Sequence, residues 1–355
     1  MPCPSPDFHN QGRRSGPSGA RNLLRLAVSA RAEQLQGANT SRDRSLEGSV
    51  SRARMGPIYR SRKVSLTAVV LILVAAVAHA SWNLFSKQAA AAGAAVFVWL
   101  LGAAATVLYA PVVAVAIAVD PPRLTALNWL FLAGTGVLQC GYFLFLQFGY
   151  RLGDLSLVYP IGRGTGALLA ALAGIVLLGE RPGPVSIAGI CCIVAGIIVI
   201  GLPGRGSREA VGGGAGLRPV AFALCTGTFI ASYTLWDKYA VSTLHTPPLL
   251  QGYASFPMML AVFAPQALRS GSRLAAVWRQ YWRQVTGAAV LAPLAYVLVL
   301  VALSFSQVDA VAPAREVSVL FGVILGRRLL GEGDLPRKLA AAAAIVAGIV
   351  AVAVS

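Results

Sequence analysis

Residues 80–87 are ASWNLFSK, and residues 231–238, which lie 151 positions later, are ASYTLWDK. Six of these eight positions are identical or exchange one aromatic residue for another. Two more segments recur at an offset of 152: LLGE at 177–180 and 329–332, and AGI at 195–197 and 347–349. A nearly constant offset at three separate places indicates an internal repeat, so the chain consists of two related halves.

The composition places these halves in a membrane. Of the 355 residues, 56% are hydrophobic and only 12% are charged, which excludes a soluble domain because such a domain would expose large apolar patches. From residue 64 onward, apolar runs recur that are long enough, at about 1.5 Å per residue, to cross a hydrocarbon core of about 30 Å. The expected spans are 65–86, 93–118, 127–149, 155–178, 185–202, 218–236, 248–267, 286–305, 309–330 and 339–354.

Ten spans divided between two halves give five spans each. Because five is odd, the second half must enter the membrane in the opposite orientation to the first, which makes the repeat inverted. The sequence therefore predicts an all-α membrane protein with ten transmembrane helices in two inverted five-helix repeats. The first repeat covers 64–203, a glycine-rich connector containing VGGGAG covers 204–217, and the second repeat covers 218–355.

The N-terminal tail, residues 1–63, is basic and lacks a periodic apolar pattern, which predicts disorder. The net charge is +17, and 12 of the 30 Lys and Arg residues lie in this tail, so the basicity is concentrated outside the apolar region and does not indicate nucleic-acid binding. Two interpretations stay open. The tail is either an Arg-rich organelle-targeting segment or sequence upstream of a true start at Met55.

Membrane orientation also stays open, because two groups of charges disagree under the positive-inside rule. The basic tail favours a cytoplasmic N-terminus. With that choice, however, the cytoplasmic loops carry only Arg123, Arg181 and Lys238, and thirteen Lys or Arg residues from Lys87 to Lys338 lie on the other side.

Charged residues inside the spans are the first candidates for a functional site, because each costs at least about 2.5–3.5 kcal/mol to insert. Arg163 lies in the fourth span, and Arg315 and Glu316 lie in the ninth. The two arginines are 152 positions apart, so they occupy equivalent places in the two halves. We therefore expect Arg163 and Arg315 to bind substrate near the centre of the protein.

Two prolines precede these arginines. Pro160 and Pro313 each remove a backbone donor, and we expect a helix break at both. Irregular backbone at membrane depth is tolerated only against protein or a water-filled cavity, which favours a polar cavity between the fourth and ninth spans. The alternative is a pair of packing kinks, with Arg315 and Glu316 satisfying neighbouring groups.

Polar residues in the recurring segment supply further substrate-binding candidates. Asn83 with Lys87, and Thr234 with Lys238, are each four residues apart and therefore share a helix face. The alternative for both lysines is that they extend to the membrane interface from helix ends.

Three aromatic residues complete the predicted substrate-binding set. Trp82 and Tyr233 adjoin the polar pairs, and Tyr159 lies beside a proline in the fourth span. Trp and Tyr are also common in the aromatic belt at the membrane surface, which is the structural alternative for the first two.

Proton coupling has two candidates. Glu316 is a carboxylate within a span and beside an arginine, although simple charge compensation by Arg315 is an equal explanation. His79 is the other titratable candidate, and a lone histidine in an apolar helix otherwise bonds to a neighbour.

Catalytic and metal sites are not expected. The five cysteines lack metal-type spacing and the three histidines are scattered, so we expect no metal, no cofactor and no enzymatic activity. The expected partners are a small-molecule substrate and membrane lipid, without nucleic acid, and a homodimer is compatible with the sequence.

Over residues 64–355 the chain resembles the EamA-type branch of the drug/metabolite transporter superfamily. The resemblance rests on 80–87 and its echo at 231–238, and on the pattern from Tyr159-Pro160 to Gly179-Glu180-Arg181-Pro182, echoed from Pro313 to Gly331-Glu332. Gly333-Asp334 replaces Arg-Pro in the second copy, so this echo is imperfect.

The resemblance implies ten helices, a central cavity and transport of small metabolites without ATP hydrolysis. It does not name a substrate, because the family spans amino acids, sugars, nucleotide sugars, amines and drugs. With the buried arginines, we expect a secondary transporter of an anionic or zwitterionic metabolite, such as an amino acid or organic acid, in the plasma (inner) membrane. The alternatives are an exporter of cationic or apolar drug-like compounds, and a membrane binding or scaffold protein.

Overall fold

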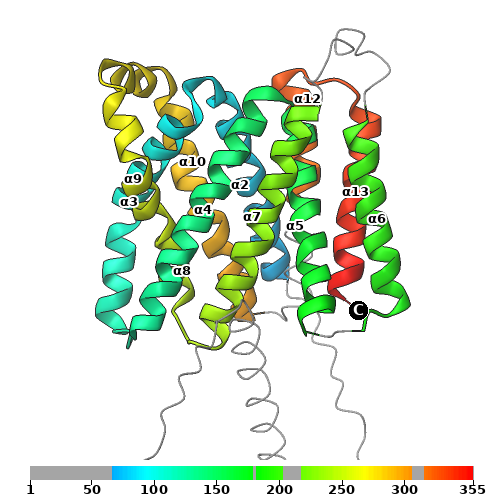
Figure 1. Ribbon diagram of the computed structural model, residues 1–355, viewed down its shortest axis with the longest axis horizontal. Helices are drawn as coiled ribbons and strands as arrows, with labels where there is room; N and C mark the ends of the chain where they lie inside the picture. Colours follow the sequence, from blue (N-terminus) through cyan, green and yellow to red (C-terminus); the bar gives the residue numbers. More distant parts are fainter. Residues whose placement is uncertain (1–65, 179–180, 203–216, 306–315, 355) are drawn as a thin grey trace, which may run out of the picture. The chain divides into compact units, whose positions relative to one another are not determined.

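The computed structural model describes residues 66–178, 181–202, 217–305 and 316–354, and every regular element in these ranges is helical. The chain separates into two compact units, 1–61 and 62–355, of which the first lies wholly outside the described residues. The predictions of a disordered tail and of an alternative start at Met55 therefore concern residues that are not described. The helical unit is drawn in Figure 1.

The first half contains five long helices and one short 3-10 turn. They are α2 (Leu66–Gln88), η1 (Ala90–Ala92), α3 (Ala94–Val119), α4 (Ala126–Leu152), α5 (Leu155–Leu178) and α6 (Pro184–Gly201). Each long helix covers one expected span. The boundaries follow local chemistry: Thr125 caps the start of α4 together with Asn128, and Gly93 precedes α3 with a φ of 95° that favours glycine.

The second half departs from the expected spans. Its described helices are α7 (Leu217–Ser242), α8 (Pro248–Tyr253), α9 (Ser255–Arg269), α10 (Ser272–Phe305), α12 (Ser318–Leu330) and α13 (Leu335–Ala353). The expected span 248–267 is formed by two adjoining helices, α8 and α9. Helix α10 begins well before the expected residue 286, because 272–285 is rich in Arg and Trp, which suit a helix at a membrane surface.

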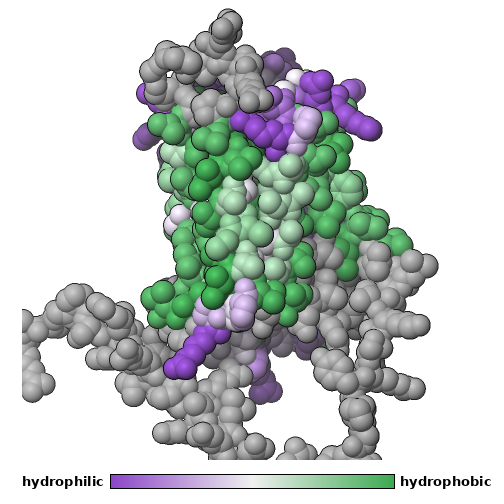
Figure 2. Space-filling view, turned by 90° about the vertical axis from the view of Figure 1, so that its right-hand side faces the viewer, coloured by the Kyte–Doolittle hydropathy of each residue, from purple (hydrophilic) through white to green (hydrophobic). Residues whose placement is uncertain are grey.

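Seven of the described helices are long and apolar enough to cross a membrane: α2, α3, α4, α5, α6, α7 and α13. Their outward residues are apolar, for example Val107, Val115 and Val119 of α3, which are at least 63% exposed. Figure 2 shows the same property on one face of the molecule, where a broad hydrophobic band lies below a hydrophilic top. The chain is therefore an integral, multi-pass membrane protein.

Close packing between the halves relies on small residues. Helices α6 and α13 lie side by side (Figure 1), and a Cβ atom added to Gly189 would lie 2.7 Å from the carbonyl oxygen of Gly348. Seven residues further along α6, a Cβ atom added to Gly196 would lie 2.7 Å from the carbonyl oxygen of Ala341. Gly196 and Gly348 belong to the recurring AGI segments, so one role of that repeat is close contact between helices.

Helices α2 and α7, which carry the recurring segments 80–87 and 231–238, run in opposite directions. Lys87, at the end of α2, bonds to the Gly153 carbonyl at the end of α4, and Pro219, in the first turn of α7, packs against the same Gly153. At the other end, Asn128 in the first turn of α4 bonds to Thr246, which follows α7. Helix α2 therefore ends at the side of the molecule where α7 begins.

Candidate functional site

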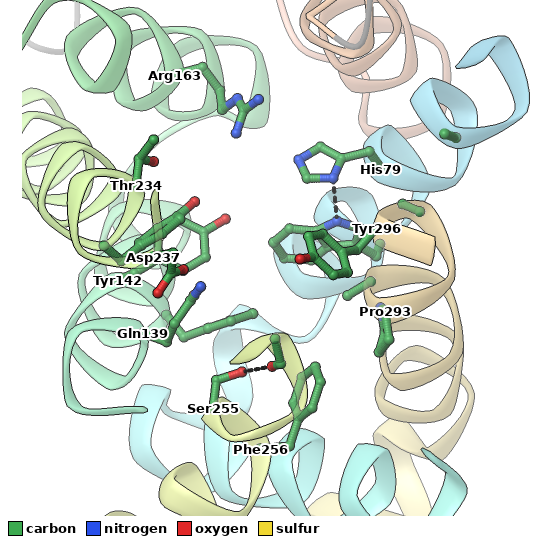
Figure 3. A pocket seen from close by; sticks show the side chains of 17 residues that line it. His79, Gln139, Tyr142, Arg163, Thr234, Asp237, Ser255, Phe256, Pro293 and Tyr296 are labelled. Atoms are coloured by element: carbon green, nitrogen blue, oxygen red, sulfur yellow. Dashed lines mark hydrogen bonds between the residues drawn. The ribbon is translucent and has the colours of Figure 1, made fainter. Parts of the chain in front are cut away.

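A cavity of about 290 Å³ lies among helices of both halves. Its polar lining residues come from α2, α4, α5, α7 and α9, and they are His79, Gln139, Arg163, Thr234, Asp237 and Ser255. Its aromatic lining residues are Trp82, Tyr142, Phe143, Tyr233, Phe256 and Tyr296. Figure 3 shows Arg163, Thr234 and Asp237 on one wall and His79, Pro293 and Tyr296 on the facing wall. We refer to this cavity as the pocket.

Arg163 forms a buried ion pair across the two halves. Its Nε donates a hydrogen bond of 3.0 Å to Oε2 of Glu316, and its Nη2 donates to Oε1 of the same carboxylate. Both residues are at most 7% exposed. The two-point geometry fixes the guanidinium in the pocket wall and balances its charge. Arg315 and Pro313 lie outside the described residues, so the predicted partner of Glu316 and the second predicted break are not described.

The expected helix break at Pro160 is wrong. Helix α5 is continuous from Leu155 to Leu178, with Pro160 in its second turn. Proline removes a single backbone bond, to the Ser156 carbonyl, and tight packing around this turn offsets that loss.

Tyr159 supports the pocket from behind and does not line it. Its hydroxyl lies 2.8 Å from the Ser318 hydroxyl at the start of α12, and its ring is 2% exposed. A Cβ atom on Gly322 would lie 2.6 Å from this ring, so Gly322 leaves the space that the tyrosine fills. The residue joins α5 to α12 beside the ion pair of Arg163.

The polar pair in the first recurring segment also lies outside the pocket lining. Asn83 accepts a bond of 2.6 Å from the Tyr150 hydroxyl and donates one of 2.8 Å to the His79 carbonyl. Lys87 Nζ donates to the carbonyls of Tyr150 and Gly153 at 2.6 and 2.7 Å. An ammonium group satisfies orphan carbonyls at the end of a helix, so Lys87 caps α4.

In the second recurring segment, Tyr233 and Thr234 line the pocket, whereas Lys238 is exposed and does not. On the facing wall, Trp82 Nε1 donates a bond of 3.1 Å to Nδ1 of His79, and the two rings meet edge to face. Trp82 and His79 therefore form one rigid part of the pocket lining.

Asp237 is the charged pocket residue that the sequence analysis missed. Its Oδ1 accepts a bond of 2.5 Å from the Thr135 hydroxyl and one of 3.0 Å from Nε2 of Gln251. Among the described residues, no Lys or Arg forms a salt bridge with it. A signal was available, because Asp237 stands where the first recurring segment has Ser86, which places an acid inside an apolar helix.

A second polar group lies at the end of the molecule where α5 begins. We call Lys87, Asp154, Ser156, Glu332 and Lys338 the end cluster. The two carboxylate oxygens of Glu332 accept bonds of 2.7 and 2.8 Å from the backbone N–H groups of Leu155 and Ser156. Lys338 Nζ donates to Asp154 Oδ2 at 2.5 Å and to Ser156 Oγ at 2.9 Å. Glu332 and Lys338 thus hold the second half onto the first turn of α5.

The described residues contain no group of three or more His, Cys, Asp or Glu side chains placed to hold a metal. The EamA-like transporter family matches residues 66–202 and again residues 217–354. The chain belongs to this family. The resemblance predicted from the recurring segments is confirmed.

Two further comparisons concern this EamA-like chain. No curated protein matches it. Among the solved structures, ten chains match, and one titled "Crystal structure of protein" has 14% identity and a TM-score of 0.51. The match covers 82% of the EamA-like chain and 98% of the solved one, which shows a shared fold alone.

The pocket of this EamA-like transporter lies between its two family-matched segments. Arg163 and Trp82 come from the first segment, and Asp237 and Tyr296 come from the second. One positively charged and one negatively charged side chain therefore reach the same cavity from different halves of a membrane transporter.

Proposed function

We propose that this protein is a secondary transporter of a small zwitterionic metabolite, such as an amino acid, in the plasma membrane. The substrate would bind in the pocket between two inverted five-helix repeats. The observation that carries the proposal is the presence of Arg163 and Asp237 in one pocket of about 290 Å³.

The ten-helix arrangement is supported by the helices that fall outside the seven clear spans. In the ten-helix arrangement, the adjoining helices α8 and α9 would together make one passage, α10 a second and α12 part of a third. The opposite directions of α2 and α7 support the inverted repeat, because these helices carry the recurring segments at 80–87 and 231–238.

The charges of the pocket favour a zwitterion over a simple anion. Glu316 already balances Arg163, so an anion would add uncompensated negative charge beside Asp237. Arginine has five N–H donors, of which Glu316 takes two, and its planar fork suits a substrate carboxylate. Asp237 would receive the substrate's ammonium group. Trp82, Tyr233 and Thr234 would contact its side chain.

The other predicted site residues have supporting roles in this proposal. Tyr159 and Asn83 hold neighbouring helices in place, Lys87 caps α4, and Lys238 is outside the pocket. Glu316 and His79 were both expected to couple transport to protons. Glu316 is the weaker candidate, because protonating its carboxylate would leave buried Arg163 without a counter-charge. A proton role would therefore fall to His79, and a His79→Gln variant that keeps its dependence on a pH gradient would exclude that role.

The test is a thermal-shift screen of the detergent-purified chain with amino acids, organic acids, phosphorylated metabolites and amines. A ligand that binds only the folded state must raise its melting temperature. We expect stabilisation by zwitterions that disappears in Arg163→Gln and in Asp237→Asn and persists in Lys238→Met. Stabilisation by organic acids alone would contradict the role of Asp237.

A second function is favoured by one observation. Asp237 is the pocket acid without a basic partner among the described residues, and aromatic side chains surround it, which suits an organic cation. An exporter of cationic drug-like compounds would be stabilised by amines that lack a carboxylate. The rise in melting temperature caused by such amines would disappear in Asp237→Asn and persist in Arg163→Gln. Uptake into proteoliposomes of the ligand found in the screen separates either transporter from a non-transporting scaffold.

A further inference from the structure

Helix α10 is too long to lie wholly within the hydrocarbon core of a membrane. Its 34 residues extend about 50 Å at about 1.5 Å per residue, whereas the core is about 30 Å thick. Tilting does not absorb the difference, because transmembrane helices tilt by at most about 40°. Residues 286–305 contain no charged residue, whereas 272–285 contain three arginines and two tryptophans. The first part of α10 therefore projects from the core into the layer of lipid headgroups.

This projecting part lies at the same end of the molecule as the end cluster. A Cβ atom added to Gly93, which follows α2, would lie 4.0 Å from Nη2 of Arg273, so α10 begins near the place where α2 ends. Lys87, in the last turn of α2, belongs to the end cluster. Figure 1 shows the turn between α9 and α10 at the top of the molecule, where α12 also ends.

Four exposed side chains form two adjacent stripes on the projecting part. Trp278 and Trp282 are four residues apart, and so are Arg279 and Arg283, so each pair shares a helix face. The tryptophans are 40% and 48% exposed, and both arginines are exposed. The guanidinium of Arg283 lies 5.4 Å from the centroid of the Trp282 ring, which joins the two stripes. The opposite face packs into the core through Val277. We call the four exposed side chains the α10 patch.

The positive charge of the α10 patch has no acidic partner within the described residues. Residues 238–308 contain no Asp or Glu. Neither Arg279 nor Arg283 forms a salt bridge with a described acid, and the same holds for Arg273. By contrast, Lys338 of the end cluster pairs with a carboxylate of its own chain. The charge of the patch is therefore available to an anionic group from outside the chain.

An anionic phospholipid fits the α10 patch in both position and chemistry. Tryptophan rings prefer the depth of the headgroups, and the planar guanidinium of arginine binds two phosphate oxygens at once. We propose that the α10 patch is a binding site for an anionic phospholipid, such as phosphatidylglycerol. Its phosphate contacts the two arginines, and its glycerol backbone and upper acyl chains contact the two tryptophans. A free phosphate ion would use the arginines and leave the tryptophans without a role.

The experiment titrates the detergent-purified full-length chain with dioleoyl-phosphatidylglycerol and follows its melting temperature. Dioleoyl-phosphatidylcholine, which has the same acyl chains and no net charge, is the reference lipid. We expect a saturable rise with phosphatidylglycerol that is much smaller with phosphatidylcholine, because a ligand of the folded state stabilises it. High salt should weaken the response, because exposed charges are screened. The double variant Arg279→Gln/Arg283→Gln should raise the concentration at half-saturation about tenfold, equivalent to about 1.4 kcal/mol.

Arg327→Gln/Arg328→Gln is the matched control. Both arginines are exposed in the last turn of α12, at the same end of the molecule, and the variant removes the same charge. This control should keep the response to phosphatidylglycerol. An equal loss in the two double variants would show diffuse attraction to a basic surface and overturn the site. Inorganic phosphate that raises the melting temperature as much as the lipid does would also overturn it.

Tryptophan fluorescence locates the bound lipid. Phosphatidylglycerol with brominated acyl chains should quench the fluorescence more than brominated phosphatidylcholine does, and the excess should disappear in Trp278→Phe/Trp282→Phe. Excess quenching that persists in this variant would place the lipid elsewhere and contradict the proposal. Neither measurement involves the transported substrate, so this site and the proposed function can each fail while the other survives.

Discussion

The end cluster and the pocket both place charged side chains inside a membrane protein, but they differ in how completely those charges are satisfied. In the end cluster, both oxygens of Glu332 accept backbone N–H groups, and Lys338 has an acid and a hydroxyl as acceptors. Asp237, which lines the pocket, has no basic partner among the described residues, and Oε1 of Gln251, which contacts Asp237 from outside the lining, has no hydrogen-bond partner among them.

This difference separates structural charge from functional charge. A fully partnered cluster gains nothing from a ligand, whereas an incompletely partnered one gains whatever a ligand can supply. The ion pair of Arg163 and Glu316 lies between the two cases, because it is balanced and yet forms part of the pocket wall. Variants that break each group should therefore affect stability and ligand binding in different proportions.

The largest expected effect follows from breaking the ion pair on one side. Glu316→Gln leaves Arg163 buried without a counter-charge, which should lower the free energy of unfolding by about 3–5 kcal/mol. Urea unfolding of the detergent-purified chain, followed by tryptophan fluorescence, measures this change. The double variant Arg163→Gln/Glu316→Gln should recover much of the loss. A double variant as unstable as the single one would show that the pair is not coupled.

A smaller loss is expected in the end cluster. Glu332→Gln replaces a carboxylate oxygen with an NH₂ group that faces a backbone N–H, which should cost about 2–3 kcal/mol. The matched control is Asp334→Asn, because Asp334 is two residues away and forms an ion pair of 3.4 Å with partly exposed Arg337. The control should cost less than about 1 kcal/mol. Substrate affinity should change in neither variant, and a changed affinity would assign the end cluster to the binding site.

The smallest effect concerns the two lysines of the recurring segments. Lys87→Met removes the cap of α4 and should lower stability by about 1–2 kcal/mol without altering substrate affinity. Lys238→Met should change neither quantity, because Lys238 is exposed and lies outside the pocket. Isothermal titration with the ligand from the screen, together with urea unfolding, checks both. A tenfold loss of affinity in Lys87→Met would restore its predicted substrate-binding role.

The membrane class, the family and the place of Arg163 could be predicted from sequence. Hydropathy is a local property, and the recurring segments are visible at a nearly constant offset. The partner of Arg163 was not predictable, because Glu316 lies 153 residues away and contact at that separation depends on the whole fold. The cost of a buried charge identified Arg163 but was not applied to Asp237, because the expected span ended at residue 236.

Other errors have similar physical causes. Pro160 was expected to break a helix, but its effect depends on how many backbone bonds it removes, and in α5 it removes one. Lys87 and Asn83 were expected in the binding site because they share a helix face, but that face packs against α4. Sequence spacing shows which residues lie together on one helix and does not show which neighbour covers them.

The contact between α6 and α13 has a consequence for the origin of the chain. Gly189 meets Gly348, and Gly196 meets Ala341. At the repeat offset of 152, position 189 corresponds to 341 and position 196 to 348, so each contact is the image of the other. The contact is therefore the same from either helix, as in an isologous pair. A gene duplication that fused two antiparallel subunits of a homodimer would leave this pattern in a single polypeptide.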